Sequence, residues 1–206
     1  MERTDLRDGA WLELARGWLD TVEASALDAA LVRDVTWEQR HIVLFGKRIL
    51  QPRLIGWAGE LPYRYSGQTL EPRPWPDAAR PILARVNRAA GAAFNHVLIN
   101  RYRDGNDSMG YHADAEPELG PDPPVATLSL GASRRFLLRR HEKRSGEAPL
   151  ELWLEHGSLL VMGGTCQRFY RHAIPRDASP GVQQRISLTF RQLLAAPGQL
   201  ARATVR

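Results

Sequence analysis

The sequence offers little that could cross-link or anchor a fold. Cys166 is the only cysteine among 206 residues, so the chain cannot close a disulfide within itself. A lone cysteine is typical of a reducing compartment, and we expect a cytoplasmic protein. No apolar run is long enough to span a bilayer, and the charged residues 1–8 lack the apolar centre of a signal peptide. We therefore expect no association with membranes.

Internal repeats and low-complexity tracts are missing as well. Hydrophobic residues make up 43% of the chain and charged residues 25%, as in ordinary soluble domains. We expect one domain over residues 1–206 that buries its own core and acts as a monomer. The net charge of +5 is uneven, because residues 1–40 carry −4 and the remainder +9. This basic body favours an anionic partner, first of all nucleic acid, although an arginine-rich composition alone would produce the same charge.

Glycine and proline divide the chain into two parts. Over residues 1–93 we expect an extension with a helix at 26–32 capped by Ser25, a strand at 41–45 and a helix at 77–90. After residue 93, short β-like runs alternate with turns, which is typical of a sandwich, barrel or jelly roll. The expected strands there are residues 94–102, 125–130, 135–139, 150–154, 158–162 and 185–190.

A histidine and a carboxylate stand two positions apart at His112 and Asp114. On a strand these positions face the same side, so an imidazole and a carboxylate would point into the same space. His172, just past an expected strand, is the best candidate for a third ligand. Two histidines and one carboxylate on one face of an octahedron describe a non-haem iron(II) site with three open positions. The H-x-D motif alone is common, and a solvated turn is the alternative interpretation.

A second pattern lies near the end of the chain. Residues 185–191 alternate, so that Arg185 and Arg191 share one face with Ser187 and Thr189, while apolar residues occupy the other. Two guanidinium groups on an inner face require anions, and a small dicarboxylic acid would satisfy both. The alternative is the polar outer face of an edge strand.

Together these motifs resemble the AlkB family of iron(II)- and 2-oxoglutarate-dependent nucleic-acid dealkylases. Residues 100–105 and 110–114 resemble its first iron motif, residues 157–162 lead to the second histidine, and residues 185–191 resemble its co-substrate strand. Phe45-Gly46-Lys47, Pro52-Arg53 and Tyr63-Arg64-Tyr65-Ser66-Gly67 resemble the nucleotide-recognition region of the animal DNA-repair members. The resemblance runs in order from about residue 41 to 193.

The resemblance implies an α+β fold with a mainly β core: a double-stranded β-helix, or jelly roll, over residues 94–193, buttressed by N-terminal helices. The implied iron ligands are His112, Asp114 and His172. The residues implied to bind 2-oxoglutarate are Asn100, Tyr102, Arg185, Thr189 and Arg191. The implied substrate contacts are Phe45, Gly46 and Lys47 with the strand, and Tyr63, Tyr65, Ala115 and Glu116 near a flipped base. Two positions depart from the family's frequent residues: Ser187, often asparagine, and Ala115, often polar.

The implied reaction is oxidative dealkylation of bases such as 1-methyladenine and 3-methylcytosine in DNA, or in RNA, as direct repair of alkylation damage. It uses iron(II), 2-oxoglutarate and dioxygen. The base must leave the stack, and Phe45 would fill the gap. A carboxylate at Glu116 would favour a cationic base, unless the chain turns it to solvent at Pro117. A basic cluster either holds phosphates or faces solvent: Arg134, Arg135, Arg139, Arg140, Lys143 and Arg144.

Three alternatives stay open. The first is an oxygenase of the same chemistry acting on protein, lipid or a small molecule, against which the basic body and Phe45-Gly46-Lys47 count. The second is a β-barrel metal protein that does not use 2-oxoglutarate, against which the Arg185 and Arg191 pair counts. The third is a catalytically silent nucleic-acid-binding relative, against which the complete ligand triad counts.

Overall fold

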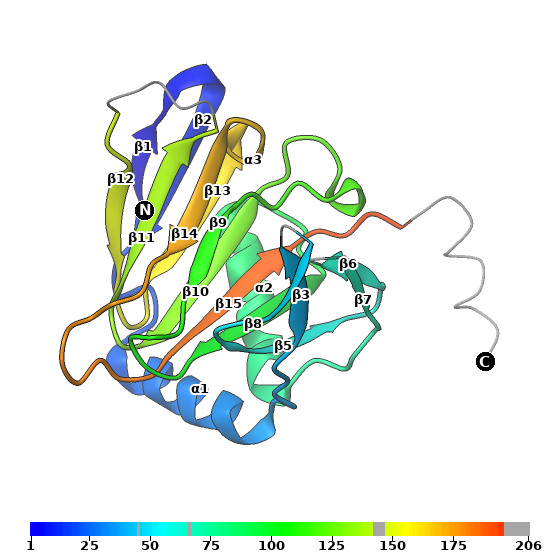
Figure 1. Ribbon diagram of the computed structural model, residues 1–206, viewed down its shortest axis with the longest axis vertical. Coiled ribbons are helices and arrows are strands. Elements are labelled where there is room, and N and C mark those ends of the chain that lie inside the picture. Colours follow the sequence, from blue (N-terminus) through cyan, green and yellow to red (C-terminus); the bar gives the residue numbers. More distant parts are fainter. Residues whose placement is uncertain (45, 66, 142–146, 196–206) are drawn as a thin grey trace.

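Two antiparallel sheets packed face to face form the body of the structure, and helices cover the outside of one of them (Figure 1). This computed structural model describes residues 1–44, 46–65, 67–141 and 147–195. The arrangement confirms the expected jelly roll with a mainly β core. Among the described residues, no helix has both the length and the apolar character needed to cross a membrane.

The larger sheet has seven strands, each antiparallel to its neighbours. Their spatial order is β1 (Glu2–Asp5), β2 (Ala10–Ala15), β13 (Leu159–Gly164), β10 (Val125–Gly131), β15 (Arg185–Arg191), β8 (His96–Tyr102) and β5 (Leu54–Gly59). Strands β1 and β2 precede residues 41–45, the first strand that we expected from the sequence. Strand β5, which was also not expected, forms the opposite edge of the larger sheet. The N-terminal residues are therefore part of the larger sheet itself.

The smaller sheet and two hairpins complete the β structure. The smaller sheet runs in the order β12 (Leu150–Leu154), β11 (Arg134–Arg140), β14 (Tyr170–Ile174) and β9 (Met109–His112). The hairpins are β3 (His41–Leu44) with β4 (Lys47–Leu50), and β6 (Tyr63–Tyr65) with β7 (Gln68–Leu70).

The helices are α1 (Thr21–Asp34), α2 (Arg80–Ala90) and the single turn α3 (Cys166–Phe169), with short 3-10 turns at Arg7–Gly9, Asp77–Ala79 and Pro117–Leu119. The expected cap of the first helix was wrong. Asp20 caps α1 by accepting a hydrogen bond from the backbone N–H of Glu23 at 2.9 Å, and Ser25 lies inside the helix. The helix begins earlier because Asp20 offers its carboxylate to the free N–H groups of the first turn.

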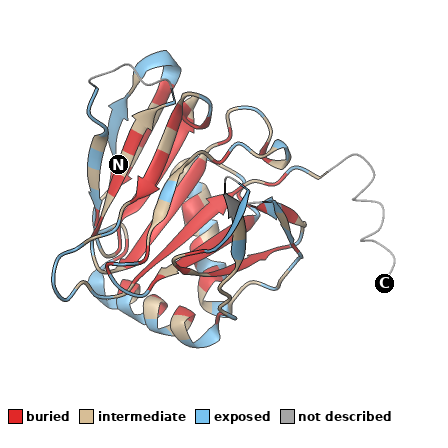
Figure 2. Ribbon diagram, in the orientation of Figure 1, coloured by how far each residue is buried: buried red, intermediate tan, exposed pale blue. Residues whose placement is uncertain are grey.

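Alternation along β15 separates the core from the site. Ile186, Leu188 and Phe190 pack with α1 and α2 in one apolar cluster on the outer side of the larger sheet. Arg185 and Arg191 face the opposite side, into the space between the sheets. Figure 2 shows the buried residues concentrated on the central strands, while the edge strands β1 and β12 and the outer surface of α1 carry exposed ones.

The expected strands from residue 94 onward are all present, but β9 and β14 complete the smaller sheet. His172 lies in the middle of β14 and not just past a strand, which corrects its expected position. The pairing of β14 with β9 shifts register between His172 and Ile174, as at a β-bulge. Such an irregularity breaks the simple alternation by which strands are recognised in a sequence.

Packing of α1 on the larger sheet gives a test of the fold. Leu31→Ala should lower the free energy of unfolding by about 2–5 kcal/mol, because Leu31 is fully buried and its removal leaves a cavity. Val22→Ala, in the same helix but 81% exposed, should change it by less than about 0.5 kcal/mol. Urea denaturation of both variants measures the difference, and equal effects would contradict this placement of α1.

Candidate functional site

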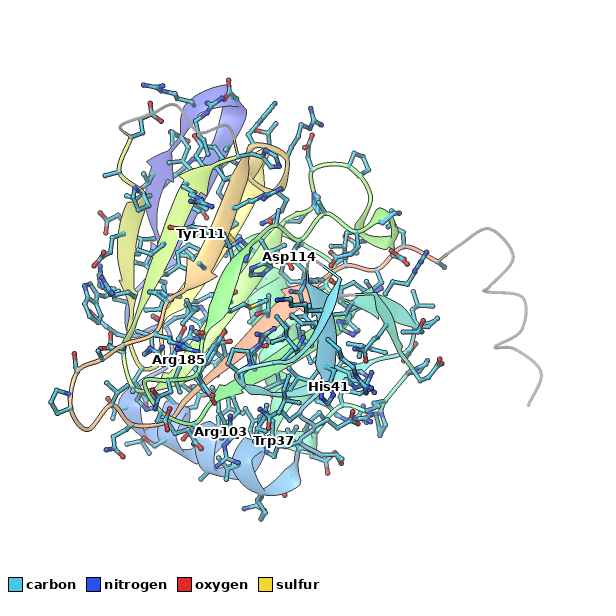
Figure 3. The ribbon with its side chains drawn as sticks, viewed as in Figure 1. Trp37, His41, Arg103, Tyr111, Asp114 and Arg185 are labelled. Atoms are coloured by element: carbon cyan, nitrogen blue, oxygen red, sulfur yellow. The ribbon has the colours of Figure 1, made fainter. Side chains whose placement is uncertain are left out.

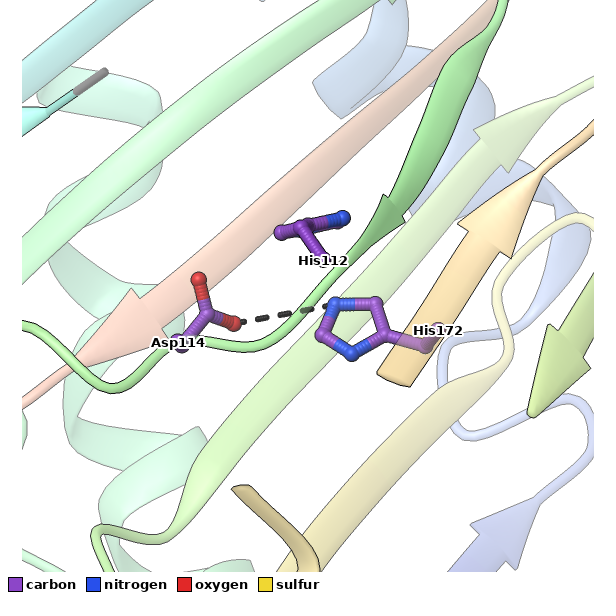
Figure 4. Close-up of side chains that lie close together, drawn as sticks. All are labelled: His112, Asp114 and His172. Atoms are coloured by element: carbon purple, nitrogen blue, oxygen red, sulfur yellow. Dashed lines mark ion pairs between the residues drawn. The ribbon is translucent and has the colours of Figure 1, made fainter. Parts of the chain in front are cut away.

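Three side chains with metal-ligand chemistry meet at one end of the space between the sheets (Figure 4). His112 is the last residue of β9, and His172 is its direct partner on β14. Their ring centroids are 4.2 Å apart. Asp114 follows two residues after the end of β9, and one potential ligand atom from each residue lies within 4.8 Å of the others.

The two carboxylate oxygens of Asp114 have different surroundings. The residue is 1% exposed, and its Oδ1 accepts hydrogen bonds from Nε and Nη2 of Arg191 at 3.1 and 2.6 Å. Its Oδ2 has no hydrogen-bond partner among the described residues and lies 3.7 Å from Nε2 of His172. A buried carboxylate oxygen left without a partner is rare, and a divalent cation would satisfy it. The donor set therefore fits an iron(II) ion.

The protonation states also suit metal binding. Burial lowers the pKa of His172 to about 3, helped by the neighbouring His112, and burial likewise lowers the pKa of His112. Burial alone would raise the pKa of Asp114, but Arg191 and the two histidines lower it to about 2. Near neutral pH the site therefore holds neutral imidazoles and an ionised carboxylate. Nδ1 of His112 lies 3.0 Å from the carbonyl oxygen of Gly110, which leaves Nε2 as the ligand atom.

Gln167 is a supporting residue that was not expected from the sequence. It lies in α3, is 3% exposed, and its Oε1 accepts a hydrogen bond from the backbone N–H of Asp114 at 2.9 Å. This contact fixes the backbone beyond β9, where no strand pairing holds it. A glutamine five residues before His172 carries no recognisable sequence signal, because only the fold brings it next to Asp114.

A cavity extends from His112 and His172 along the inner face of β15. Apolar side chains of Phe136, Leu154 and Ile174 line one side of it. The side chains expected to bind 2-oxoglutarate all line it as well: Asn100, Tyr102, Arg185, Thr189 and Arg191. Figure 3 shows Asp114 and Arg185 toward the two ends of β15, so the cavity has a metal end and an arginine end.

Arg185 is a buried cation that forms no ion pair with any described residue. It is 1% exposed, and its Nη2 donates to the hydroxyl of Ser129 at 2.8 Å, while Nε and Nη1 have no partner among the described residues. Burial lowers the pKa of Arg185 to about 10, which still leaves it charged near neutral pH. A carboxylate arriving from the cavity would meet free, charged N–H donors on Nε and Nη1. This arrangement fits the distal end of a dicarboxylic co-substrate.

Arg53 connects the cavity to the hairpin β6–β7. Its Nε donates to Oδ1 of Asn100 at 2.8 Å, and its Nη2 donates to the hydroxyl of Tyr65 at 2.7 Å. The amide oxygen of Asn100 is thereby occupied, which leaves the amide N–H groups as the donors for a ligand. Arg53 belongs to a motif that resembles the AlkB family, but no local pattern indicated that it orients Asn100.

The expected substrate contacts that the structure describes differ in their exposure. Tyr63 and Tyr65 are buried on one face of β6, whereas Lys47 and Ala115 are exposed. Glu116 is half-buried, and burial together with the carboxylate of Asp114 raises its pKa. Its backbone stays extended up to Pro117, so it has not turned away with the 3-10 turn that follows. Gly46 has a φ of 73°, the left-handed conformation of a tight turn, and Phe45 lies outside the described residues.

The basic cluster is smaller than expected. Arg134 is fully buried, so its assignment to a surface cluster was wrong. Arg135 and Arg140 have acidic partners in Glu151 and Asp8. Arg139 lies over the ring of Tyr111 at 3.8 Å and directly opposite Arg171 of β14. The remaining two members, Lys143 and Arg144, lie outside the described residues.

Comparison with known proteins supports what the site's chemistry indicates. A model of the 2OG-Fe(II) oxygenase superfamily matches residues 12–191. The chain belongs to this superfamily. Iron(II) and 2-oxoglutarate, which the superfamily's name specifies, match the two ends of the cavity.

The relatives of this chain confirm the resemblance to the AlkB family. It is 37% identical over 188 residues to the alpha-ketoglutarate-dependent dioxygenase alkB homolog 3 of Homo sapiens, covering 88% of this chain and 65% of the relative. It is 39% identical over 162 residues to DNA oxidative demethylase ALKBH2 of Homo sapiens, covering 75% and 61%. The chain spans less than two thirds of the length of these curated relatives. The solved structure of OsALKBH1 has the same fold, with a TM-score of 0.61, 18% identity and coverage of 93% of this chain and 100% of that one.

Replacement of Asp114 tests the metal centre. Asp114→Asn should weaken Mn(II) binding by more than about tenfold, because a neutral oxygen replaces an anionic ligand and even outer contacts are worth about 10–100-fold. The amide oxygen can still accept from Arg191, so the melting temperature should fall less than in Asp114→Ala, which leaves a buried guanidinium unpaired. Calorimetric titration with Mn(II) and thermal denaturation measure both effects. Unchanged metal affinity in Asp114→Asn would remove this residue from the ligand set.

Proposed function

We propose that this oxygenase removes alkyl groups from N-alkylated bases in nucleic acid, with DNA as the first substrate to test. One observation carries the proposal: the cavity has a His-Asp-His ligand set at one end and, at the other, Arg185 with N–H donors that no described residue satisfies. Bound iron(II), with 2-oxoglutarate and dioxygen, supplies the oxidation of an N-alkyl carbon. The name of one relative, DNA oxidative demethylase ALKBH2, supports the choice of substrate.

The side chains have distinct roles in this proposal. His112, Asp114 and His172 hold the iron, and Arg191 keeps Asp114 ionised by pairing with its Oδ1. Arg185 binds the distal carboxylate of 2-oxoglutarate and orients the co-substrate through its charge and its N–H donors. The polar inner face of β15 and β8 positions the co-substrate through Asn100, Tyr102 and Thr189.

The outer face of the smaller sheet supports nucleic acid as the partner. Arg139 on β11 and Arg171 on β14 are directly opposite each other, an arrangement of like charges that is unfavourable by itself. Neither forms an ion pair with any residue that the structure describes. A phosphate between them would relieve the repulsion. The exposed Lys47 and Arg48 of β4 add positive charge on the hairpin that resembles the strand-contacting element.

We further propose that the protein acts as a monomer in a reducing, cytoplasmic environment. The lone Cys166 is 1% exposed, and burial raises its pKa to about 12, so it is an unreactive thiol. Sedimentation at micromolar concentration tests the oligomeric state.

The decisive experiment incubates the protein with a panel of N-methylated DNA and RNA oligonucleotides, iron(II), ascorbate and 2-oxoglutarate, followed by mass measurement of the products. Loss of a methyl group from DNA with consumption of 2-oxoglutarate supports the proposal. Consumption of 2-oxoglutarate without any change in the oligonucleotides would point to a protein, lipid or small-molecule substrate. Binding of the oligonucleotides without turnover would instead identify a catalytically silent relative.

The phosphate contacts can be tested through salt. Binding of undamaged DNA should weaken steeply as salt rises, and Arg139→Glu or Arg171→Glu should reduce the logarithmic slope by about one for each phosphate that the variant no longer neutralises. Arg135→Glu is the matched control, because Arg135 is on the same strand but already faces Glu151 at 3.7 Å. Fluorescence anisotropy across a salt series gives the slopes. Slopes equal to that of the unmodified protein would move the binding surface elsewhere, for example to Lys47 and Arg48.

The half-buried Glu116 generates a prediction about lesion preference. Methylation at N1 of adenine or N3 of cytosine leaves the base cationic, and a carboxylate beside it would favour that base over neutral 1-methylguanine or 3-methylthymine. Glu116→Gln should lose this selectivity while Mn(II) affinity stays unchanged. Glu118→Gln, two residues further along, is the control. Competition between lesions in one strand measures the ratio, and a preference kept by Glu116→Gln would assign selectivity to Tyr63, Tyr65 or the chemistry itself.

A further inference from the structure

Arg134 stands at a position of β11 where the alternation requires an apolar residue. Arg134, Phe136 and Leu138 are the inward-facing, buried residues of that strand. The side chain of Arg134 is fully buried, yet it forms no ion pair with any residue in the described ranges. Burying a guanidinium that pairs directly with no anion is costly, and the nearby carboxylates of Asp177, Asp107 and Asp104 offset that cost through space. A cation here indicates a role beyond packing.

The donors of Arg134 join the two segments that carry the metal ligands. Its Nη1 donates to the carbonyl oxygen of Asp104 at 3.1 Å, and its Nη2 donates to those of Asp107 at 2.9 Å and Pro175 at 2.7 Å. Asp104 and Asp107 lie in the loop between β8 and β9, which leads to His112. Pro175 directly follows β14, the strand of His172. One guanidinium thus links the β8–β9 loop to the end of β14 through three hydrogen bonds to backbone carbonyl oxygens.

The same guanidinium lies near the arginine end of the cavity. Its Cζ is 5.7 Å from the centroid of the Tyr102 ring, and Cζ of Arg185 is 5.3 Å from that centroid. Two buried cations therefore lie close to one aromatic ring, and they repel each other in surroundings of low dielectric constant. Burial first, and then the charge of Arg134, lower the pKa of Arg185.

We propose that Arg134 is a positioning and specificity-determining residue for the co-substrate, whose buried charge makes the Arg185 end of the cavity select an anionic group. The proposal rests on the 2-oxoglutarate site proposed above. A 2-oxo acid with a distal carboxylate relieves the repulsion between Arg134 and Arg185. A 2-oxo acid of the same length with an uncharged end does not, so the two cations together enforce a preference that Arg185 alone would enforce more weakly.

The test compares 2-oxoglutarate with its distal amide, which has the same length and an uncharged end. Binding of each is measured by calorimetry on the Mn(II)-loaded protein without dioxygen. Arg134→Gln, which keeps donors for the carbonyl oxygens but loses the charge, should weaken binding of 2-oxoglutarate by about tenfold, a change of one in the logarithm of the dissociation constant. Binding of the amide should change by less than about twofold, since no distal charge is present to lose.

Two further variants separate charge from structure. Arg103→Gln alters the same loop on its exposed side, where Arg103 pairs with Asp107, and both ligands should bind as before. Arg134→Lys keeps the charge but not the fork, so it should lower the melting temperature and keep the preference for 2-oxoglutarate. It also carries the test if Arg134→Gln does not fold.

An equal loss of both ligands in Arg134→Gln, unchanged binding of 2-oxoglutarate in that variant, or loss of the preference in Arg134→Lys would overturn the proposal. Failure of the unmodified protein to bind 2-oxoglutarate at all would instead refute the proposed co-substrate site.

Discussion

The contact between Asp114 and Arg191 is the constraint on which the site depends. A carboxylate that is 1% exposed would normally take up a proton, but a guanidinium 2.6 Å from its Oδ1 keeps it ionised. The pair also ties the end of β15 in one sheet to the segment that follows β9 in the other. With neutral His112 and His172, the four groups carry no net charge. A divalent ion entering this environment therefore introduces positive charge that a dianionic co-substrate can balance, which couples the binding of the two.

That coupling requires a sheet with two chemically opposite faces. On β15 the apolar residues Ile186, Leu188 and Phe190 hold the helices, and the polar residues between them line the cavity. A substitution in either set can shift the backbone that positions the other set, because the two sets alternate along one strand. The buried arginines are tolerated on this strand since the opposite face contributes the apolar burial that stabilises it.

The sequence predicted those elements whose signal is local. Alternation in residues 185–191 predicted both the strand and its two faces, and the spacing of His112 and Asp114 predicted a shared direction. Strand β14 was missed because its register shift interrupts the alternation. The helix cap at Asp20 was missed because Ser25, a residue that also caps helices, stands nearby in the sequence. Gln167 and the buried role of Arg134 could not be predicted at all. Each acts through the backbone of a residue at least 27 positions away, and only the folded chain shows which backbone that is.

The first fifteen residues have a consequence for the rest of the larger sheet. β2 pairs along β13 from Ala10 to Ala15, and the short, charged β1 covers β2 in turn. A chain shortened to begin after residue 15 would leave β13 as the edge, with a row of free backbone N–H and C=O groups next to the apolar residues 159–162. Such an edge is a template for pairing between molecules. By completing the sheet, β1 and β2 keep the edge of β13 from such pairing, although they lie far from His112, Asp114 and His172 in the sequence.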